Sequence, residues 1–329
     1  MREEIETAIG AELAPEEKTD SFTIKFNNDD GSLEGRSFPT RLSLGDEIEA
    51  WDQRLMRLRR RPLLGIPTGL VALDQVTSGM RGMWLLSGPP GRGKSALAIQ
   101  LGIDAVRADA QVVLLYVSLE ASRWDLYDRV AARLAKLDQR VLLLGRRGEE
   151  PLGVEERDRV ADARNVMGEI GGRVRIIDLP ASELSESRVE YELRTLGSGE
   201  GRRPLVMIDS MDSWVSGRSS ASEAENERVE AMKAVRGLVG ESGALFVVGE
   251  SPANVSSSDP LLAAVGSARR AAAPDTVLAL QRADDRDRGA SEEGVTPMEL
   301  AILKGRDGVT TGAVPLDFYY RENRFALRQ

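Results

Sequence analysis

The 329-residue sequence contains no cysteine and no histidine. These absences exclude disulfide bonds, zinc sites built on thiolates or imidazoles, and acid–base chemistry by imidazole. A general base in this protein must therefore be a carboxylate, a lysine or a tyrosine. The sequence also lacks any apolar run near the roughly 18 to 20 residues that span a bilayer, and its N-terminus lacks an apolar signal core. We therefore expect a cytoplasmic protein with no membrane partner.

Positive charge is scarcer than negative charge. The chain carries 44 Lys and Arg residues against 53 Asp and Glu residues, a formal net charge of −9. This balance argues against a protein coated in positive charge for nucleic-acid binding, but it leaves room for a local basic patch. With 41% hydrophobic residues, a chain of this length can bury one large core, so we expect one α/β domain with an appendage.

The chain divides into three segments by composition. Residues 1–41 begin with a strongly acidic stretch and predict a poorly ordered N-terminal extension, in which residues 21–38 either form a small hairpin or stay extended. Residues 42–61 predict an amphipathic helix that starts with a capping box at Ser43 and Asp46. Its apolar stripe recurs every three or four residues: Leu44, Ile48, Trp51, Leu55 and Leu58. This helix either packs on its own domain or is a linker docked on a neighbouring subunit.

Residues 62–329 alternate short apolar runs with helical stretches. The runs are residues 83–88, 111–120, 174–179, 204–210, 244–251, 276–281 and 298–304. Near-continuous apolar strands separated by helices predict an α/β fold with a mostly parallel central sheet covered on both faces. Residues 312–320 predict an antiparallel hairpin partner for the last of these strands.

Residues 88–95 match the phosphate-loop pattern G-x-x-x-x-G-K-[ST] between an apolar run and an amphipathic stretch. In such loops glycines let backbone N–H groups turn toward phosphates, and the helix start adds partial positive charge. Lys94 can reach the β- and γ-phosphate oxygens of ATP, and Ser95 can bind Mg²⁺. The predicted nucleotide contacts are Gly88, Pro89, Pro90, Gly91, Arg92, Gly93, Lys94, Ser95 and Ala96.

Two carboxylates are candidates for the hydrolytic site. Asp209 ends an apolar run, which suits a water-mediated Mg²⁺ contact, although an Asp at a strand end also serves to cap the next turn. Glu120 ends the predicted strand 112–120 and would lie beside the phosphate loop at the carboxyl edge of the sheet. The alternative for Glu120 is a solvent-facing residue ahead of the next helix.

Five blocks together resemble one family. Residues 65–79, the phosphate loop, and residues 117–130, 204–214 and 300–325 are similar in order and spacing to the RecA-like motor domain of DnaB-type replicative helicases. The resemblance covers roughly residues 42–329 and identifies residues 62–329 as the ATPase motor domain. It implies a homohexamer that hydrolyses ATP between subunits while it translocates on single-stranded DNA. A loader or another replication protein would be a further partner.

The resemblance also implies roles for single residues. Lys94 and Ser95 would hold phosphates and Mg²⁺, and Asp209 would contact Mg²⁺ through water. Glu120 would orient or activate the attacking water. Arg129 matches an arginine that the family places near the nucleotide. Lys304 and Arg306 match a pair that reaches into the neighbour's site, with Arg306 as the arginine finger; we expect both on one face of a strand.

The sequence departs from the family pattern in three places. Glu250 stands where the family usually has a glutamine that senses the γ-phosphate, and a carboxylate there would repel the phosphate unless it is protonated or paired. Only 41 residues precede the linker helix, which is too few for the family's collar domain. The segments expected to contact nucleic acid are poor in positive charge, with Arg218, Arg269 and Arg270 as the candidates.

Two alternatives to a helicase stay open at this point. One is a RecA-like recombination or loader ATPase whose partner is a protein. The other is a nucleotide-dependent switch or scaffold with weakened catalysis, which Glu250 motivates.

Overall fold

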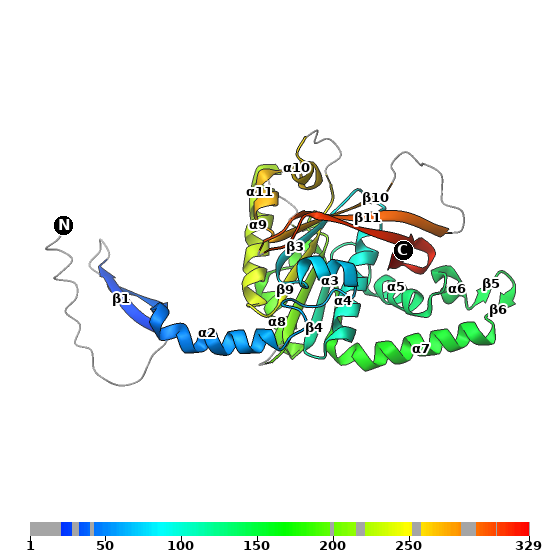
Figure 1. The fold of residues 1–329 in the computed structure, drawn as a ribbon, viewed down its shortest axis with the longest axis horizontal. Coiled ribbons are helices and arrows are strands. Elements are labelled where there is room, and N and C mark those ends of the chain that lie inside the picture. The colour runs from blue at the N-terminus through cyan, green and yellow to red at the C-terminus, as the bar shows by residue number, and fades with distance from the viewer. Residues whose placement is uncertain are drawn as a thin grey trace. The chain divides into compact units, whose positions relative to one another are not determined.

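The computed structural model of the protein describes residues 21–27, 33–39, 43–197, 201–214, 221–251, 258–283, 294–306 and 308–328. The chain divides into two units, residues 1–62 and residues 63–329, each of which is described by itself (Figure 1). Within the described ranges, no helix is both long and apolar enough to cross a membrane.

The described residues of the first unit form two paired strands and a helix. Strands β1 (Ser21–Asn27) and β2 (Leu33–Pro39) pair in antiparallel register. Over these described residues, the segment follows the hairpin alternative rather than the single extended one. Helix α2 (Leu44–Arg59) begins with the predicted capping box: the Ser43 hydroxyl accepts the Asp46 N–H, and the Asp46 carboxylate accepts the Ser43 N–H at 2.9 Å. None of the residues of α2 is buried.

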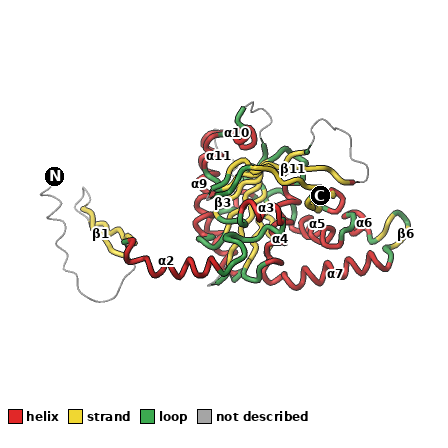
Figure 2. The backbone as a smooth tube through the Cα atoms, viewed as in Figure 1, coloured by secondary structure: helices red, strands yellow, loops and turns green. Residues whose placement is uncertain are grey.

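The second unit is built on a nine-stranded sheet (Figure 2). Its strands are β3 (Gly82–Ser87), β4 (Val112–Ser118), β7 (Val174–Asp178), β8 (Arg203–Asp209), β9 (Ala244–Val248), β10 (Thr276–Arg282), β11 (Val295–Lys304), β12 (Gly312–Tyr319) and β13 (Arg324–Leu327). The order across the sheet is β13-β12-β11-β10-β3-β9-β8-β4-β7. The six strands from β10 to β7 are parallel, and β10, β11, β12 and β13 pair in antiparallel fashion. The predicted parallel sheet and C-terminal hairpin are confirmed.

Helices connect the parallel strands and cover both faces of the sheet. They are α3 (Val71–Thr77), α4 (Lys94–Ala108), α5 (Arg123–Ala135), α6 (Gln139–Leu144), α7 (Val154–Ile170), α8 (Glu186–Thr195), α9 (Ala221–Leu238), α10 (Pro260–Val265) and α11 (Ala268–Ala272). Two short strands of two residues each, β5 (Arg146–Arg147) and β6 (Glu150–Pro151), pair between α6 and α7. Figure 1 shows α4 and α5 on one side of the sheet and α9 and α11 on the other.

The core consists of two main apolar clusters, one on each face. Successive residues of β3 alternate between them: Trp84 packs in one cluster with residues of α4, and Leu85 packs in the other with residues of α9. Because both faces are buried, the strands read as continuous apolar runs rather than alternating ones. Each large apolar side chain that is fully buried contributes about 1.5–3 kcal/mol to stability.

This topology brings four short segments to one edge. The phosphate loop, Glu120 and Glu250 follow the carboxyl ends of β3, β4 and β9, and Asp209 is the last residue of β8; these four strands are neighbours in the sheet. Ligands of open α/β folds bind at this edge. The candidate site is therefore assembled by strand order.

Candidate nucleotide-binding site

The phosphate loop connects β3 to α4 and has the backbone shape of an anion cradle. Gly91 and Gly93 adopt φ values of 72° and 85°, a region that side chains disfavour. A Cβ on Gly88 would lie 2.6 Å from the Leu280 carbonyl oxygen, and one on Gly93 would lie 2.8 Å from the Phe318 ring. No side chain caps the N-terminus of α4, so its first N–H groups remain available to an anion.

Lys94 is buried under this loop. Its Nζ donates hydrogen bonds to the carbonyl oxygens of Gly88 at 2.9 Å and Pro89 at 3.0 Å. Burial lowers the pKa of Lys94 below its ordinary value, against the opposing charges of four carboxylates: Glu250, Asp209, Asp212 and Glu120. Three of these acids, Glu250, Asp209 and Glu120, were predicted from the sequence as candidates for the nucleotide site, and in the structure the charge of each acts on Lys94.

Asp209 is buried beside Ser95. The phenolic oxygen of Tyr116 donates a hydrogen bond to Oδ2 of Asp209 at 2.7 Å, and the Ser95 hydroxyl also hydrogen-bonds this carboxylate. Burial raises the pKa of Asp209 above its ordinary value, and the bonds from Tyr116 and Ser95 and the charge of Arg129 oppose that rise. Ser95 and Asp209, the two predicted Mg²⁺ contacts, therefore lie together. Half-buried Arg129 is close enough for its charge to lower the pKa of Asp209.

Glu120 lies in a loop, not at the end of a strand as predicted. Strand β4 ends at Ser118 because the Ser118 hydroxyl bonds the backbone of Ala121 and turns the chain. The exposed Glu120 carboxylate accepts hydrogen bonds from the hydroxyls of Ser210 at 2.5 Å and Ser213 at 2.7 Å. These two bonds lower the pKa of Glu120 below its ordinary value. The carboxylate is thus held ionised next to the segment that follows Asp209.

Glu250 is exposed at the end of the next strand. Its backbone N–H donates to Oδ2 of Asp212 at 2.5 Å, and Arg270 Nη2 lies 3.1 Å from Oδ1 of the same carboxylate. Only 13% of the Arg270 side chain is exposed. Arg270 was predicted from the sequence to be among the nucleic-acid contacts; in the structure its guanidinium pairs with Asp212 at the edge of the candidate nucleotide site.

The other two nucleic-acid candidates are Arg269 and Arg218. Arg269 lies exposed on α11, next to Arg270 in the chain. Arg218 lies outside the described residues. Arg269 is therefore the one candidate of the three that the structure describes at the surface.

Lys304 and Arg306 meet, but not on one strand face as predicted. Strand β11 ends at Lys304, and Arg306 belongs to the turn in which the Val309 N–H bonds the Arg306 carbonyl oxygen at 3.2 Å. Both side chains nevertheless hold the segment 271–275. Lys304 Nζ donates to three carbonyl oxygens there, and Arg306 pairs with Asp275 at 2.9 Å.

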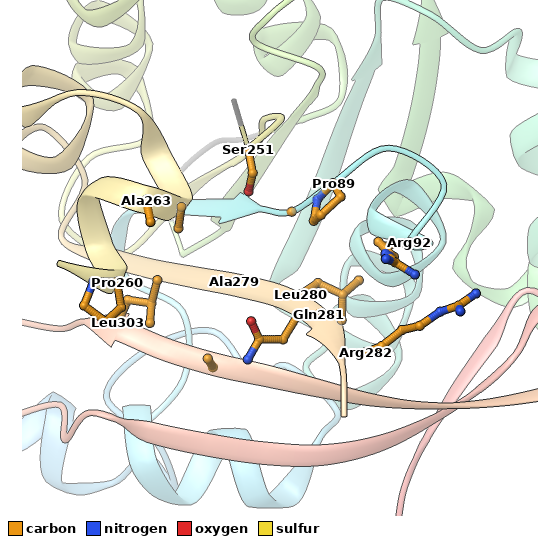
Figure 3. A pocket seen from close by; sticks show the side chains of 13 residues that line it. Pro89, Arg92, Ser251, Pro260, Ala263, Ala279, Leu280, Gln281, Arg282 and Leu303 are labelled. Carbon is orange, nitrogen blue, oxygen red and sulfur yellow. The ribbon is translucent and has the colours of Figure 1, made fainter. Parts of the chain in front are cut away.

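A pocket of about 360 Å³ opens beside the phosphate loop. Its floor includes small residues of β10 and β11, namely Ala279 and Ala301. Figure 3 shows Arg92 and Arg282 on one side of the pocket and Pro260 on the other. The remaining loop residues predicted as contacts differ in exposure: Pro89 and Pro90 are exposed, whereas Ala96 is buried in the first turn of α4.

Sequence reasoning missed four residues of this site. Ser210, Asp212 and Ser213 follow Asp209 directly, and a run of polar residues after an apolar strand was a usable signal for them. Tyr116 carried no such signal because its contact with Asp209 depends on the parallel pairing of β4 with β8. Such a pairing is not encoded locally.

The second unit of the chain matches a known protein family. The model of the DnaB-like helicase C terminal domain family matches residues 65–327. Two curated relatives are each 24% identical: Replicative DNA helicase DnaB of Geobacillus stearothermophilus over 288 residues, and Replicative DNA helicase DnaC of Bacillus subtilis (strain 168) over 277 residues. The alignments cover 84% and 81% of this chain but 60% and 57% of the relatives. The chain thus spans less than two thirds of their length.

Solved structures share the fold. A DnaB-like replicative helicase, described with its interactions with primase, matches with a TM-score of 0.70 at 19% identity over 86% of this chain and 68% of that one. A second solved structure, an ATPase domain, matches with a TM-score of 0.70 at 20% identity over 87% of this chain and 100% of that domain. The predicted RecA-like fold is confirmed.

Proposed function

Because the chain belongs to the DnaB-like helicase C terminal domain family, we propose that it is an ATP-hydrolysing motor that translocates on single-stranded DNA and unwinds duplex DNA. The observation that carries the proposal is the convergence of Lys94, Asp209 and Glu120 at the carboxyl edge of the sheet. A phosphate cradle, a buried metal-facing acid and an ionised carboxylate are the parts that hydrolysis of a nucleoside triphosphate requires.

The residues present fit ATP with Mg²⁺. The cradle offers backbone N–H groups, and Lys94 would exchange its two carbonyl partners for phosphate oxygens. Ser95 and Asp209 would hold Mg²⁺, directly and through water, and the ion would neutralise charge on the phosphates. Among the described residues no group of three or more acids could hold a metal ion by itself. The phosphates and water would therefore complete the coordination.

Glu120 would position the water that attacks. The water oxygen forms a bond to the γ-phosphorus while the bond from that phosphorus to the bridging oxygen breaks, leaving ADP and inorganic phosphate. Glu120 orients the water and accepts its proton. The hydroxyls of Ser210 and Ser213 fix the carboxylate and favour its ionised form.

Lys304 and Arg306 would act in the site of a second copy. Asp275, which holds Arg306, also accepts the Met83 N–H at 2.8 Å, near the amino end of β3. The phosphate loop follows the opposite end of that strand, and the stretch from Met83 to Gly88 spans roughly 16 Å at about 3.3 Å per residue. An arginine side chain does not bridge that length. We therefore propose a homohexamer in which each ATP site receives Arg306 from its neighbour.

Helix α2 supports assembly with a second copy. Three residues of its apolar stripe are exposed, with Leu44 83%, Ile48 51% and Trp51 52% accessible. Side chains of this kind along one helix face are typical of a surface that another protein covers. The described residues of the first unit leave these side chains uncovered, and we propose that a neighbouring subunit covers them.

One observation favours a second candidate function, a nucleotide-dependent switch with weakened hydrolysis. Glu250 is the first of the carboxylates whose charge acts on Lys94, and it would compete with the γ-phosphate for that cation. The two functions differ in turnover. A switch predicts similar ATP turnover for the wild type and Glu120→Gln, whereas a motor predicts a large loss in the variant.

The proposal is tested by ATP hydrolysis with and without single-stranded DNA, on protein whose assembly is measured in the same buffer. We expect closed rings of six, turnover stimulated by single-stranded DNA, and unwinding of a forked duplex. Because DNA phosphates release counterions on binding, the stimulation should weaken steeply as salt rises. Assembled protein whose turnover no nucleic acid changes would contradict the motor function.

A further inference from the structure

Helix α11 contacts both the nucleotide-binding edge and the Lys304–Arg306 pair. Arg270 extends from this helix to Asp212, whereas the carbonyl oxygens of the next two residues, Ala271 and Ala272, hold Lys304. The two sets of contacts therefore start from adjacent residues. A movement at one set has a short, direct path to the other.

The backbone at the nucleotide-binding edge leaves room for the Arg270 guanidinium. A Cβ on residue 249 would lie 3.1 Å from Arg270 Nη2, so Gly249 leaves the space that the guanidinium uses. Asp212, which receives this guanidinium, also accepts the Glu250 N–H, and its charge acts on Lys94. Arg270 thus ends beside the groups that surround the γ-phosphate position.

The same contact is able to change. Arg270 meets Asp212 through one nitrogen only, and its buried Nε has no hydrogen-bond partner among the described residues. A γ-phosphate held by Lys94 would add negative charge near Asp212 and Glu250, whose charges act on that lysine. It therefore repels both carboxylates and attracts the guanidinium.

Several hydrogen bonds hold Lys304 and Arg306 to the C-terminal part of α11 and the residues after it. Lys304 Nζ donates to the carbonyl oxygens of Ala271 at 2.8 Å, Ala272 at 3.0 Å and Pro274 at 2.6 Å. Arg306 adds a bond to the Ala272 carbonyl oxygen at 3.3 Å. A shift of α11 must therefore move Lys304 and Arg306 or break several hydrogen bonds.

We propose that α11 is a connector that couples the nucleotide state of its own chain to the position of Lys304 and Arg306, with Arg270 as the positioning residue. The proposal rests on the proposed function, because it gives the pair that would complete a neighbour's ATP site a dependence on the nucleotide of its own chain. Nucleotide binding at one ATP site would then change the position of the Lys304–Arg306 pair that completes the neighbouring site.

The absence of native cysteines allows a site-specific test. Thr310, exposed in the turn after Arg306, is changed to cysteine and given an environment-sensitive label. Labelled chains are diluted into a large excess of unlabelled wild-type chains, so that all neighbours are the same. The signal is recorded on addition of AMP-PNP with Mg²⁺ for labelled chains that carry no further change, Arg270→Ala, Lys94→Ala, or Lys233→Ala, a control at an exposed ion pair on α9.

We expect AMP-PNP to shift the label in the parent and in the Lys233→Ala control. The shift should fall by roughly threefold or more in both the Arg270→Ala and the Lys94→Ala chains, although Arg270→Ala still binds AMP-PNP in a separate titration. Asp212→Asn, which keeps the side-chain shape, replaces Arg270→Ala if that variant does not fold or bind. A full shift in the variant used, or no shift in the parent, would overturn the connector.

The outcome is independent of the motor function. A label shift that depends on Arg270 in a protein without DNA-stimulated turnover would leave the connector intact and contradict the proposed function. A protein with DNA-stimulated turnover and a shift independent of Arg270 would do the reverse.

Discussion

The phenolic oxygen of Tyr116 lies 2.7 Å from Oδ2 of Asp209 and donates a hydrogen bond to it. Both residues are buried, on the neighbouring strands β4 and β8. The bond opposes the rise in the pKa of Asp209 that burial causes. Tyr116 therefore helps to keep this buried carboxylate, the proposed Mg²⁺ contact, ionised.

Tyr116→Phe removes this donor and keeps the ring. Because a hydrogen bond to a charged group contributes about 1.5–3 kcal/mol, we expect ATP turnover at limiting Mg²⁺ to fall roughly tenfold or more. The pKa of Asp209 should rise further, so the loss should be larger at acid pH. Steady-state hydrolysis measured against Mg²⁺ at two pH values checks this, with Tyr127→Phe on α5 as the control. Unchanged Mg²⁺ and pH dependence in Tyr116→Phe would refute the role.

Asp209→Asn should separate stability from activity. The folded chain holds the pKa of Asp209 above its ordinary value, chiefly through burial. Ionising the carboxyl therefore costs folding free energy that appears as the pH rises from the unfolded pKa through the folded one. We expect Asp209→Asn to raise the melting temperature of the nucleotide-free protein at neutral pH and to abolish ATP hydrolysis. Melting curves at neutral and acid pH measure the first effect, and it should vanish below both pKa values.

Ser213→Ala should shift the pH profile of hydrolysis. The Ser210 and Ser213 hydroxyls lower the pKa of Glu120, so the variant should raise that pKa and move the acid limb of kcat/KM to higher pH. Any stability that the low pKa of Glu120 gives is present above the unfolded pKa and is lost as pH falls through the folded value. Glu120→Gln should lower kcat by about 10² to 10⁴ at pH values above the acid limb. An acid limb that stays in place in Ser213→Ala would rule out the serine contribution.

Lys304 and Arg306 should differ in what they stabilise. Lys304 satisfies three carbonyl oxygens, so Lys304→Ala should lower the free energy of unfolding by about 1–3 kcal/mol. Arg306 is 55% exposed in its pair with Asp275, so Arg306→Ala should cost at most about 1 kcal/mol. If Arg306 is an arginine finger, its loss should lower kcat by about 10³ or more. Denaturant unfolding and hydrolysis assays on the same preparations test both halves of this prediction.

The sequence predicted the sheet and the phosphate loop because both are encoded locally. Continuous apolar runs mark strands buried on two faces, and the spacing of Gly88, Gly93, Lys94 and Ser95 marks the loop. The positions of Glu120 and Asp209 at this edge were also predictable, because Glu120 follows an apolar strand and Asp209 ends one. Strand ends were less predictable: a turn at Ser118 ends β4 before Glu120, and a turn at Arg306 ends β11 before that residue.

Contacts between distant segments were not predictable. The direction of Arg270 depends on Gly249 and Asp212, which β9 and β8 bring to the same edge. Arg270 was expected to contact nucleic acid because the family resemblance places its segment there, and the segment alone does not show where the side chain points. The role of Tyr116 depends on strand pairing in the same way.

The most direct test of the central claim, that the ATP site is shared between copies, mixes two inactive variants. Lys94→Ala lacks the phosphate-binding cation, and Arg306→Ala lacks the cation supplied to the neighbour. In randomly mixed rings, up to about one quarter of the sites pair an intact loop with an intact neighbouring Arg306. We therefore predict that an equal mixture recovers up to about one quarter of wild-type ATP hydrolysis. Activity no higher than that of the two variants assayed apart, in mixtures shown to exchange subunits, would contradict the account.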